Sequence, residues 1–175
     1  MKLIAITKPD FYDGEAAFIK SLFESGFDIV HLRKPNSDIV NCRNILNELS
    51  SEERSRIVVH DYPELYYEFS LKGIHINKNI VKYPEGYQGF KTRSCHSLEE
   101  VKLYKDEFDY VFLSPIFDSI SKQGYKSSFT EDELRRASEE GIIDEKVVAL
   151  GGVTYDKISL LKDLGFGGAA MMGGI

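Results

Sequence analysis

The stretch "VVALGGVTYDKISLLKDLGFGGAAMMGGI", residues 147–175, decides the fold class of this sequence. Two short apolar runs, residues 146–150 and 166–171, end within this stretch, and a glycine pair comes shortly after each, at residues 151–152 and 173–174. Between the runs, Ile158, Leu161 and Leu164 recur at the spacing of one face of a helix. A strand, a helix and a second strand in this order predict two parallel strands joined by a right-handed crossover.

The same alternation extends back to the beginning of the sequence. Further short apolar runs, rich in Val, Ile and Phe, occupy residues 3–6, 28–32, 56–59, 73–76, 90–93 and 110–113. Segments of helical period separate most of them, for example the segment that carries Ile39, Arg43, Leu46 and Leu49. Eight such strands can close into a barrel. We therefore predict an α/β protein, a (β/α)8 TIM barrel that forms a single domain over residues 1–175.

Local signals at the ends of the predicted helices agree with this division. Ser97 with Glu100, and Thr130 with Glu133, have the spacing of a capping box at a helix start. Glycines stand where helix C-termini need a left-handed residue, at Gly26, Gly141 and Gly165.

Two features depart from an ideal barrel. Residues 77–89, "NKNIVKYPEGYQG", are too few and too irregular for a full helix, so we expect a loop or a single turn as the fourth connection. The sequence also ends at Ile175, directly after the eighth predicted strand, so we expect a barrel that lacks its final helix, whether in the native protein or only in this piece of it. Such a barrel would leave an apolar flank, which a second copy in a homo-oligomer could cover.

Composition excludes several classes of function. The formal net charge of −6 argues against a nucleic-acid-binding surface, although a local basic pocket for phosphate is compatible with it. No charged leader and no run of about 20 apolar residues is present, so we expect a cytoplasmic protein without a membrane partner. Cys42 and Cys95 lack the spacing of a zinc site or a disulfide framework and are interpreted as packed core residues.

The glycine pairs suggest a phosphate site. In barrels of this class, the loops after the seventh and eighth strands present backbone N–H groups to phosphate, and glycine allows close approach. Those loops contain Gly151, Gly152, Gly173 and Gly174. A single pair would more simply indicate a tight turn, but two pairs at matching strand ends favour an anion site.

Polar residues follow the other predicted strands as well, and a site for a multiply charged anion would use such cations and hydroxyls. Taken singly, each has a structural explanation as a cap, a solvated charge or a hydrogen-bonded core residue, and His75 is interpreted as a core residue. These strand-end residues are Arg33, Lys34, His60, Asp61, Asn77, Lys78, Ser94, His96, Ser119, Ser121 and Lys122.

The order of these motifs resembles the thiamine phosphate synthase/TenI family over essentially the whole sequence. The motifs are "HLRK", "VVHD", "GIHIN", "RSCHSLEEV", "SPIFDSISKQG", "VVALGGV" and "GFGGAAMMGGI". Thiamine phosphate synthases join a hydroxymethylpyrimidine diphosphate to a thiazole phosphate and use Mg2+ to help pyrophosphate leave. TenI-type relatives instead tautomerise a thiazole carboxylate phosphate. The resemblance therefore implies phosphorylated thiazole and pyrimidine small molecules as partners.

The resemblance also implies residue roles. Arg33 would meet the diphosphate oxygens and, with His96 and Lys122, would act in catalysis. Asp61 would be a metal ligand. The thiazole phosphate would be held by main-chain amides of Gly151, Gly152, Met172 and Gly173, and the remaining substrate contacts would come from Lys34, His60, Asn77, Ser94, Ser119 and Ser121.

The sequence departs from the synthase pattern at specific positions. A synthase has Asn followed by Asp at the third strand end, where this sequence has His60 and Asp61. Ile80 stands in place of the second metal carboxylate, which puts the Mg2+ site in doubt. Pro35 replaces an expected lysine, for which the neighbouring Lys34 could substitute. His96 matches the TenI histidine that shuttles a proton.

Three hypotheses follow. A synthase with a modified metal site is favoured by Ser119, Ser121 and Lys122, while a metal-independent thiazole tautomerase is favoured by His96 and Ile80. The third hypothesis is a non-catalytic sensor or regulatory protein that binds a phosphorylated ligand without turnover. The synthase is the leading hypothesis.

Overall fold

The computed structural model describes residues 1–118, 127–172 and 175. Its parallel strands follow one another in sequence order in a closed barrel, which confirms the predicted (β/α)8 class. The strands are β1 (Lys2–Ile6), β2 (Ile29–Leu32), β3 (Ile57–Val59), β4 (Gly73–Ile76), β5 (Phe90–Cys95), β6 (Tyr110–Leu113), β7 (Val147–Ala149) and β8 (Gly168–Met171). Each coincides with a predicted apolar run, with ends that differ by at most two residues.

The chain divides into two compact units, and each is described by itself. One is Ile4–Lys91, and the other combines Met1–Leu3 with Thr92–Ile175. The single-domain organisation expected from the sequence stays a prediction.

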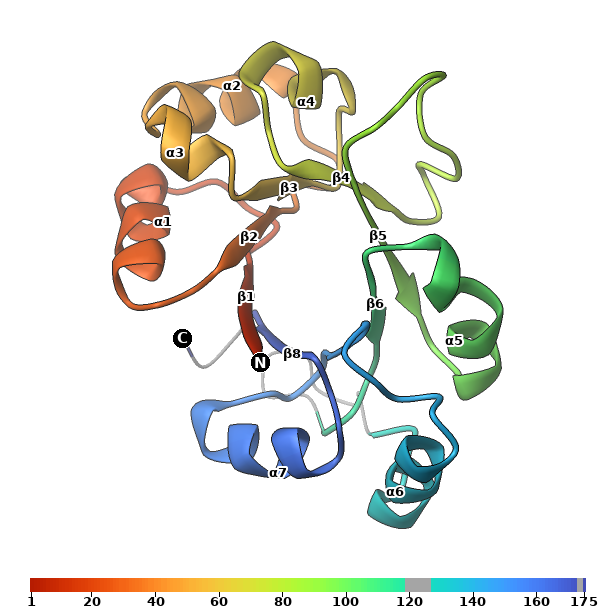
Figure 1. The fold of residues 1–175 in the computed structure, drawn as a ribbon. Helices are drawn as coiled ribbons and strands as arrows, with labels where there is room; N and C mark the ends of the chain where they lie inside the picture. The colour runs from red at the N-terminus through yellow and green to blue at the C-terminus, as the bar shows by residue number, and fades with distance from the viewer. Residues whose placement is uncertain (119–126, 173–174) are drawn as a thin grey trace. The chain divides into compact units, whose positions relative to one another are not determined.

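In the unit Ile4–Lys91, β1 to β4 pair in parallel, and every side chain of β2 and β3 is buried. Strands covered on both faces are rich in Val, Ile and Leu, which is the composition of the predicted runs. Figure 1 shows the helices of this unit along one side of its strands. They are α1 (Glu15–Glu24), α2 (Ile39–Asn47), α3 (Ser51–Arg54) and α4 (Glu64–Phe69).

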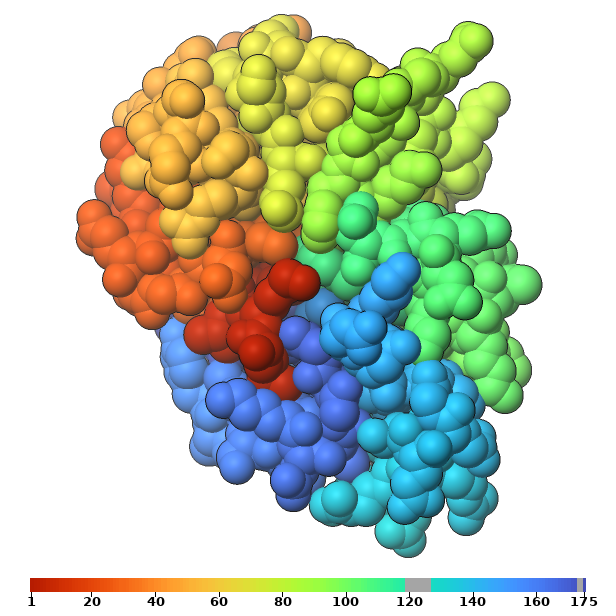
Figure 2. Space-filling view, in the orientation of Figure 1, coloured from red at the N-terminus to blue at the C-terminus, as the bar shows by residue number. Residues whose placement is uncertain are grey.

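The connection from β4 to β5 contains no helix, as predicted, and extends as a yellow-green loop in Figures 1 and 2. Its buried Tyr87 holds the two strands. The Tyr87 hydroxyl accepts a hydrogen bond from the Ile74 amide at 2.8 Å and donates one to the Phe90 carbonyl. The Tyr87 ring also stacks on Tyr83 and meets the edge of Tyr66. Aromatic packing and the two hydrogen bonds of Tyr87 therefore hold this connection against the strands in the absence of a crossover helix.

In the second unit, β5 to β8 pair in parallel. The helical elements of this unit are α5 (Leu98–Tyr104), η1 (Lys105–Glu107), α6 (Glu131–Glu139), η2 (Tyr155–Lys157) and α7 (Ile158–Asp163). Between Met1 and Ile175, within the residues that the structure describes, no helix combines the length and apolar character that crossing a bilayer requires.

Helix starts confirm part of the sequence analysis. Thr130 and Glu133 form a complete capping box at α6. At α5, Ser97 accepts from the Glu100 amide, but the Glu100 carboxylate accepts from the amide of His96 instead of the one of Ser97. Positive φ angles at Gly26, Gly141 and Gly165 agree with the predicted helix ends.

Candidate active site

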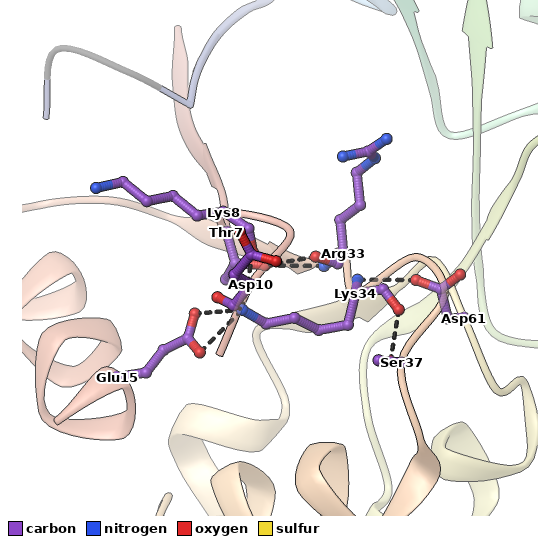
Figure 3. A network of polar contacts seen from close by, with 8 residues as sticks. All are labelled: Thr7, Lys8, Asp10, Glu15, Arg33, Lys34, Ser37 and Asp61. Carbon is purple, nitrogen blue, oxygen red and sulfur yellow. Dashed lines mark hydrogen bonds and ion pairs between the residues drawn. The ribbon is translucent and has the colours of Figure 1, made fainter. Parts of the chain in front are cut away.

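The end of β2 places two cations on opposite sides of the chain. Thr7 Oγ1, just after β1, accepts a hydrogen bond from the Arg33 amide at 2.9 Å and donates one to the Arg33 carbonyl at 3.2 Å. This pair fixes the Arg33 backbone. Figure 3 shows the Arg33 side chain turned away from Lys34, and its guanidinium makes no hydrogen bond or ion pair with another residue that the structure describes. The Arg33 guanidinium can therefore accept an anionic ligand without breaking a described contact, and its predicted contact with diphosphate stays a prediction.

Lys34 has a structural role instead of the predicted substrate contact. Its side chain is buried, and its ammonium donates to the carbonyls of Lys8 at 2.8 Å and Asp10 at 2.9 Å and to the Glu15 carboxylate at 2.6 Å (Figure 3). An ammonium has three donors, and these acceptors use all of them. Burial raises the pKa of Glu15 even though Lys34 opposes the rise. Lys34 therefore cannot replace the lysine that the family pattern has at Pro35.

Asp61 and Asn77 help to shape the ends of β3 and β4. The Asp61 carboxylate accepts from the Lys34 amide at 2.8 Å through one oxygen. Asn77 Oδ1 accepts from the amides of Asn79 and Ile80, and Asn77 Nδ2 donates to the His60 carbonyl at 3.2 Å. Asn77 thus holds a turn, which accounts for it without the substrate contact that the resemblance implies. The substrate role of Asn77 and the metal role of Asp61 stay predictions.

His60 lies inside the unit, in contact with two further histidines. It is 6% exposed, and its Nε2 is 2.7 Å from Nδ1 of His31. The His75 ring stacks on the His60 ring, and His75 is buried, as its interpretation as a core residue requires. Burial lowers the pKa of both His31 and His60 well below the usual value, and His75 adds to this effect. Sequence reasoning missed His31, whose only signal was its place one residue before the end of the second apolar run.

In the second unit, His96 and Ser114 come together after β5 and β6. His96 Nδ1 lies 3.2 Å from Ser114 Oγ and 3.3 Å from the Ser114 carbonyl. His96 is exposed whereas Ser114 is buried, so the serine can orient the imidazole. Sequence reasoning named His96 but missed Ser114, which the motif "SPIFD" placed at the adjoining strand end. Ser94, two residues before His96, is half-buried in β5.

The loop after β7 has the backbone that the phosphate hypothesis requires. Gly151 and Gly152 have φ angles of +96° and +63°. A Cβ on Gly152 would lie 2.2 Å from the Asp118 carbonyl oxygen, so only glycine fits. Lys157 donates to the Gly152 carbonyl at 2.7 Å, while the amides of these glycines bond to no residue that the structure describes. Unbonded amides at a strand end are donors for an anion.

Some predicted site residues lie outside the described ranges. These are Ser119, Ser121, Lys122 and Gly173. Met172, which is described, follows β8 directly and is half-buried.

Comparisons with known proteins agree on one family. The family described as thiamine monophosphate synthase matches residues 3–175. A solved structure of thiamine phosphate pyrophosphorylase from Bacteroides thetaiotaomicron is 44% identical, with a TM-score of 0.90, over 99% of this chain and 83% of that one. The thiamine-phosphate synthase of Limosilactobacillus reuteri is 28% identical over 66% of this chain, which spans only 56% of the length of that relative. The thiamine-phosphate synthase of Shouchella clausii is 26% identical over 94% of this chain and 83% of its own length.

Removing one partner of the buried ion pair is expected to destabilise the protein. In Glu15→Ala, the Lys34 ammonium stays buried without its carboxylate, and we expect the free energy of unfolding to fall by about 3–5 kcal/mol. Urea denaturation followed by far-UV circular dichroism measures this change.

Glu68→Ala is the matched control, because Glu68 pairs with Arg43 on the surface of the same unit. Its loss is expected to change the free energy of unfolding much less than Glu15→Ala does, because an exposed ion pair contributes little to stability. Equal losses in the two variants would contradict the structural role given to Lys34 and Glu15.

Proposed function

The chain belongs to the thiamine monophosphate synthase family, and on this premise we propose that it joins hydroxymethylpyrimidine diphosphate to thiazole phosphate with release of pyrophosphate. The observation that carries the proposal concerns Arg33. Thr7 holds the Arg33 backbone, and the Arg33 guanidinium has no hydrogen-bond or ion-pair partner among the described residues. The names of the relatives support the same reaction.

Arg33 suits the charge that this reaction develops. When the C–O bond to the diphosphate breaks, electron density moves onto the leaving oxygens and a pyrimidine-methyl cation remains. A planar guanidinium can donate two parallel hydrogen bonds to such oxygens. Because Thr7 fixes the Arg33 backbone, only the Arg33 side chain has to adjust when the diphosphate binds.

The residues present meet the minimum requirement of Mg2+. This ion is often held by one or two carboxylates together with substrate phosphates and water. One oxygen of Asp61 is bonded to the Lys34 amide, and Asp61 would hold the ion, while Ile80 supplies no second carboxylate. When bound, Mg2+ neutralises charge on the diphosphate. With a single carboxylate, we expect Mg2+ to bind more weakly than at a two-carboxylate site, so that a higher Mg2+ concentration is needed for half-maximal activity.

The glycine loop after β7 would hold the other substrate. Amides of Gly151 and Gly152 are donors for a phosphate, and the position of this loop after the seventh strand is typical of phosphate sites in this fold. Met172 and the residues outside the described ranges, Gly173, Ser119, Ser121 and Lys122, keep the roles that the family resemblance implies.

Replacing Arg33 is expected to remove most of the synthase activity. In Arg33→Ala, we expect kcat/KM for pyrophosphate release to fall about 10²- to 10³-fold, because a donor aimed at developing charge is lost. A coupled pyrophosphate assay with both substrates and Mg2+ measures it. Arg43→Ala, a surface variant of the same unit, is expected to keep the wild-type rate. A rate in Arg33→Ala equal to wild type would overturn the assignment.

The Gly152→Ala substitution tests the phosphate loop. The new Cβ would lie 2.2 Å from the Asp118 carbonyl, so the loop must move, and we expect KM for thiazole phosphate to rise at least about tenfold. Gly141→Ala imposes a similar backbone strain, with φ +76°, in open space of the same unit. If both variants changed KM for thiazole phosphate equally, the effect would be general strain and the loop assignment would be wrong.

A second candidate function is the tautomerisation of a thiazole carboxylate phosphate. The contact between His96 and Ser114 favours it, because a proton on Nδ1 can be donated to the Ser114 carbonyl, leaving Nε2 to accept and return a proton. This reaction requires no diphosphate and no Mg2+.

The tautomerase hypothesis predicts isomerisation in the presence of a chelator. We expect His96→Ala to abolish it, and Ser114→Ala to shift its pH profile while part of the rate remains, because Ser114 only positions the ring. Nuclear magnetic resonance of the thiazole carboxylate phosphate follows the reaction. No isomerisation by the wild-type protein would exclude this function, and ligand binding without turnover in either assay would instead indicate a sensor.

A further inference from the structure

Three buried imidazoles meet within the unit Ile4–Lys91. His31 lies in β2, His60 follows β3 and His75 lies in β4. One nitrogen of each ring can be chosen so that all three atoms lie within 4.8 Å of one another. The rings are at most 6% exposed.

The strand register explains why the rings converge. In β3 and β4, Val59 pairs with Ile74, so the next residues along the two strands, His60 and His75, are neighbours on one face. Their rings stack with centroids 4.1 Å apart. His31 presents its ring edge-on, with its centroid 5.0 Å from that of His60 and 5.5 Å from that of His75.

The arrangement has the chemistry of a nitrogen-ligand site. A metal binds a neutral imidazole through a ring-nitrogen lone pair, and one nitrogen from each of these three rings lies in the same small volume. The short contact of 2.7 Å between Nδ1 of His31 and Nε2 of His60 requires one proton between two lone pairs. A dication is a chemical substitute for that proton.

We propose that His31, His60 and His75 form a binding site for a divalent transition metal of the Zn2+ class. Tetrahedral Zn–N bonds of about 2.0–2.1 Å place ligand nitrogens about 3.3 Å apart. The His31–His60 nitrogens therefore separate by about 0.6 Å on binding. The stacked rings of His60 and His75 also turn out of their parallel arrangement, because a lone pair lies in the plane of its ring and both must point at one ion. A fourth position is left for water or another ligand. Imidazole favours Zn2+, Co2+ and Ni2+ over Mg2+, which separates this site by ligand type from the carboxylate of Asp61.

Metal binding by the whole chain tests the proposal without any enzyme assay. After treatment with a chelator and its removal, the protein is titrated with Co2+ and, separately, with Zn2+ by calorimetry. We expect one equivalent to bind, with the visible absorption of tetrahedral Co2+ that Zn2+ displaces and Mg2+ does not produce. His31→Gln and His75→Gln are each expected to weaken binding at least about tenfold.

The matched control is His96→Gln, which changes the fourth histidine of the chain and leaves the cluster intact. It is expected to bind the metal as wild type does. Absence of saturable binding to the wild-type protein, or equal loss in all three variants, would overturn the proposal.

A measurement on the wild-type protein alone covers the case in which the cluster variants do not fold. In ¹⁵N-edited nuclear magnetic resonance of the histidine rings, Zn2+ is expected to shift the resonances of three histidines and leave those of His96 unchanged. Shifts at His96 alone, or at no histidine, would refute the site. Because neither substrate nor Mg2+ is used, a failure of the proposed synthase activity does not affect this result.

Discussion

The Lys34 ammonium is the contact on which the geometry of the first unit depends. It is fully buried, and burial of an isolated charge is costly, so the pair with Glu15 and the bonds to the carbonyls of Lys8 and Asp10 must compensate. Those acceptors lie on the loop after β1 and at the start of α1, while the Lys34 amide donates to Asp61 after β3. One residue thus ties together the segments that follow β1, β2 and β3.

The buried position of Lys34 also determines the direction of the Arg33 side chain. Neighbouring residues of an extended chain point to opposite faces, so burying Lys34 on one side turns Arg33 to the other (Figure 3). In Arg33–Lys34, the lysine makes the structural ion pair and the arginine is left for the substrate. After β3, the His60 imidazole joins two further rings, while the Asp61 carboxylate accepts from the Lys34 amide.

The sequence predicted what depends on local periodicity and missed what depends on distant partners. The strands, the loop between β4 and β5, and the capping box at Thr130 are properties of short windows, so the eightfold barrel could be inferred from them. The role of Lys34 could not, because Glu15 lies 19 residues upstream and no short-range pattern links them. Likewise, His31 and His75 converge on His60 only through the register of three strands, which single-strand patterns do not contain.

The donor atoms near the end of β3 affect both the proposed Mg2+ site and the demand placed on Arg33. Relative to the synthase pattern, His60 replaces an amide oxygen donor by an imidazole nitrogen, and Ile80 removes a carboxylate. Both changes remove an oxygen donor from the neighbourhood of Asp61, which makes it less suitable for a hard cation. A diphosphate bound there carries the same negative charge as before, so fixed cations of the chain must neutralise a larger share of it. Among the described strand-end residues of the first unit, Arg33 meets that demand best, because its backbone is held by Thr7 while the ammonium of Lys34 is already committed.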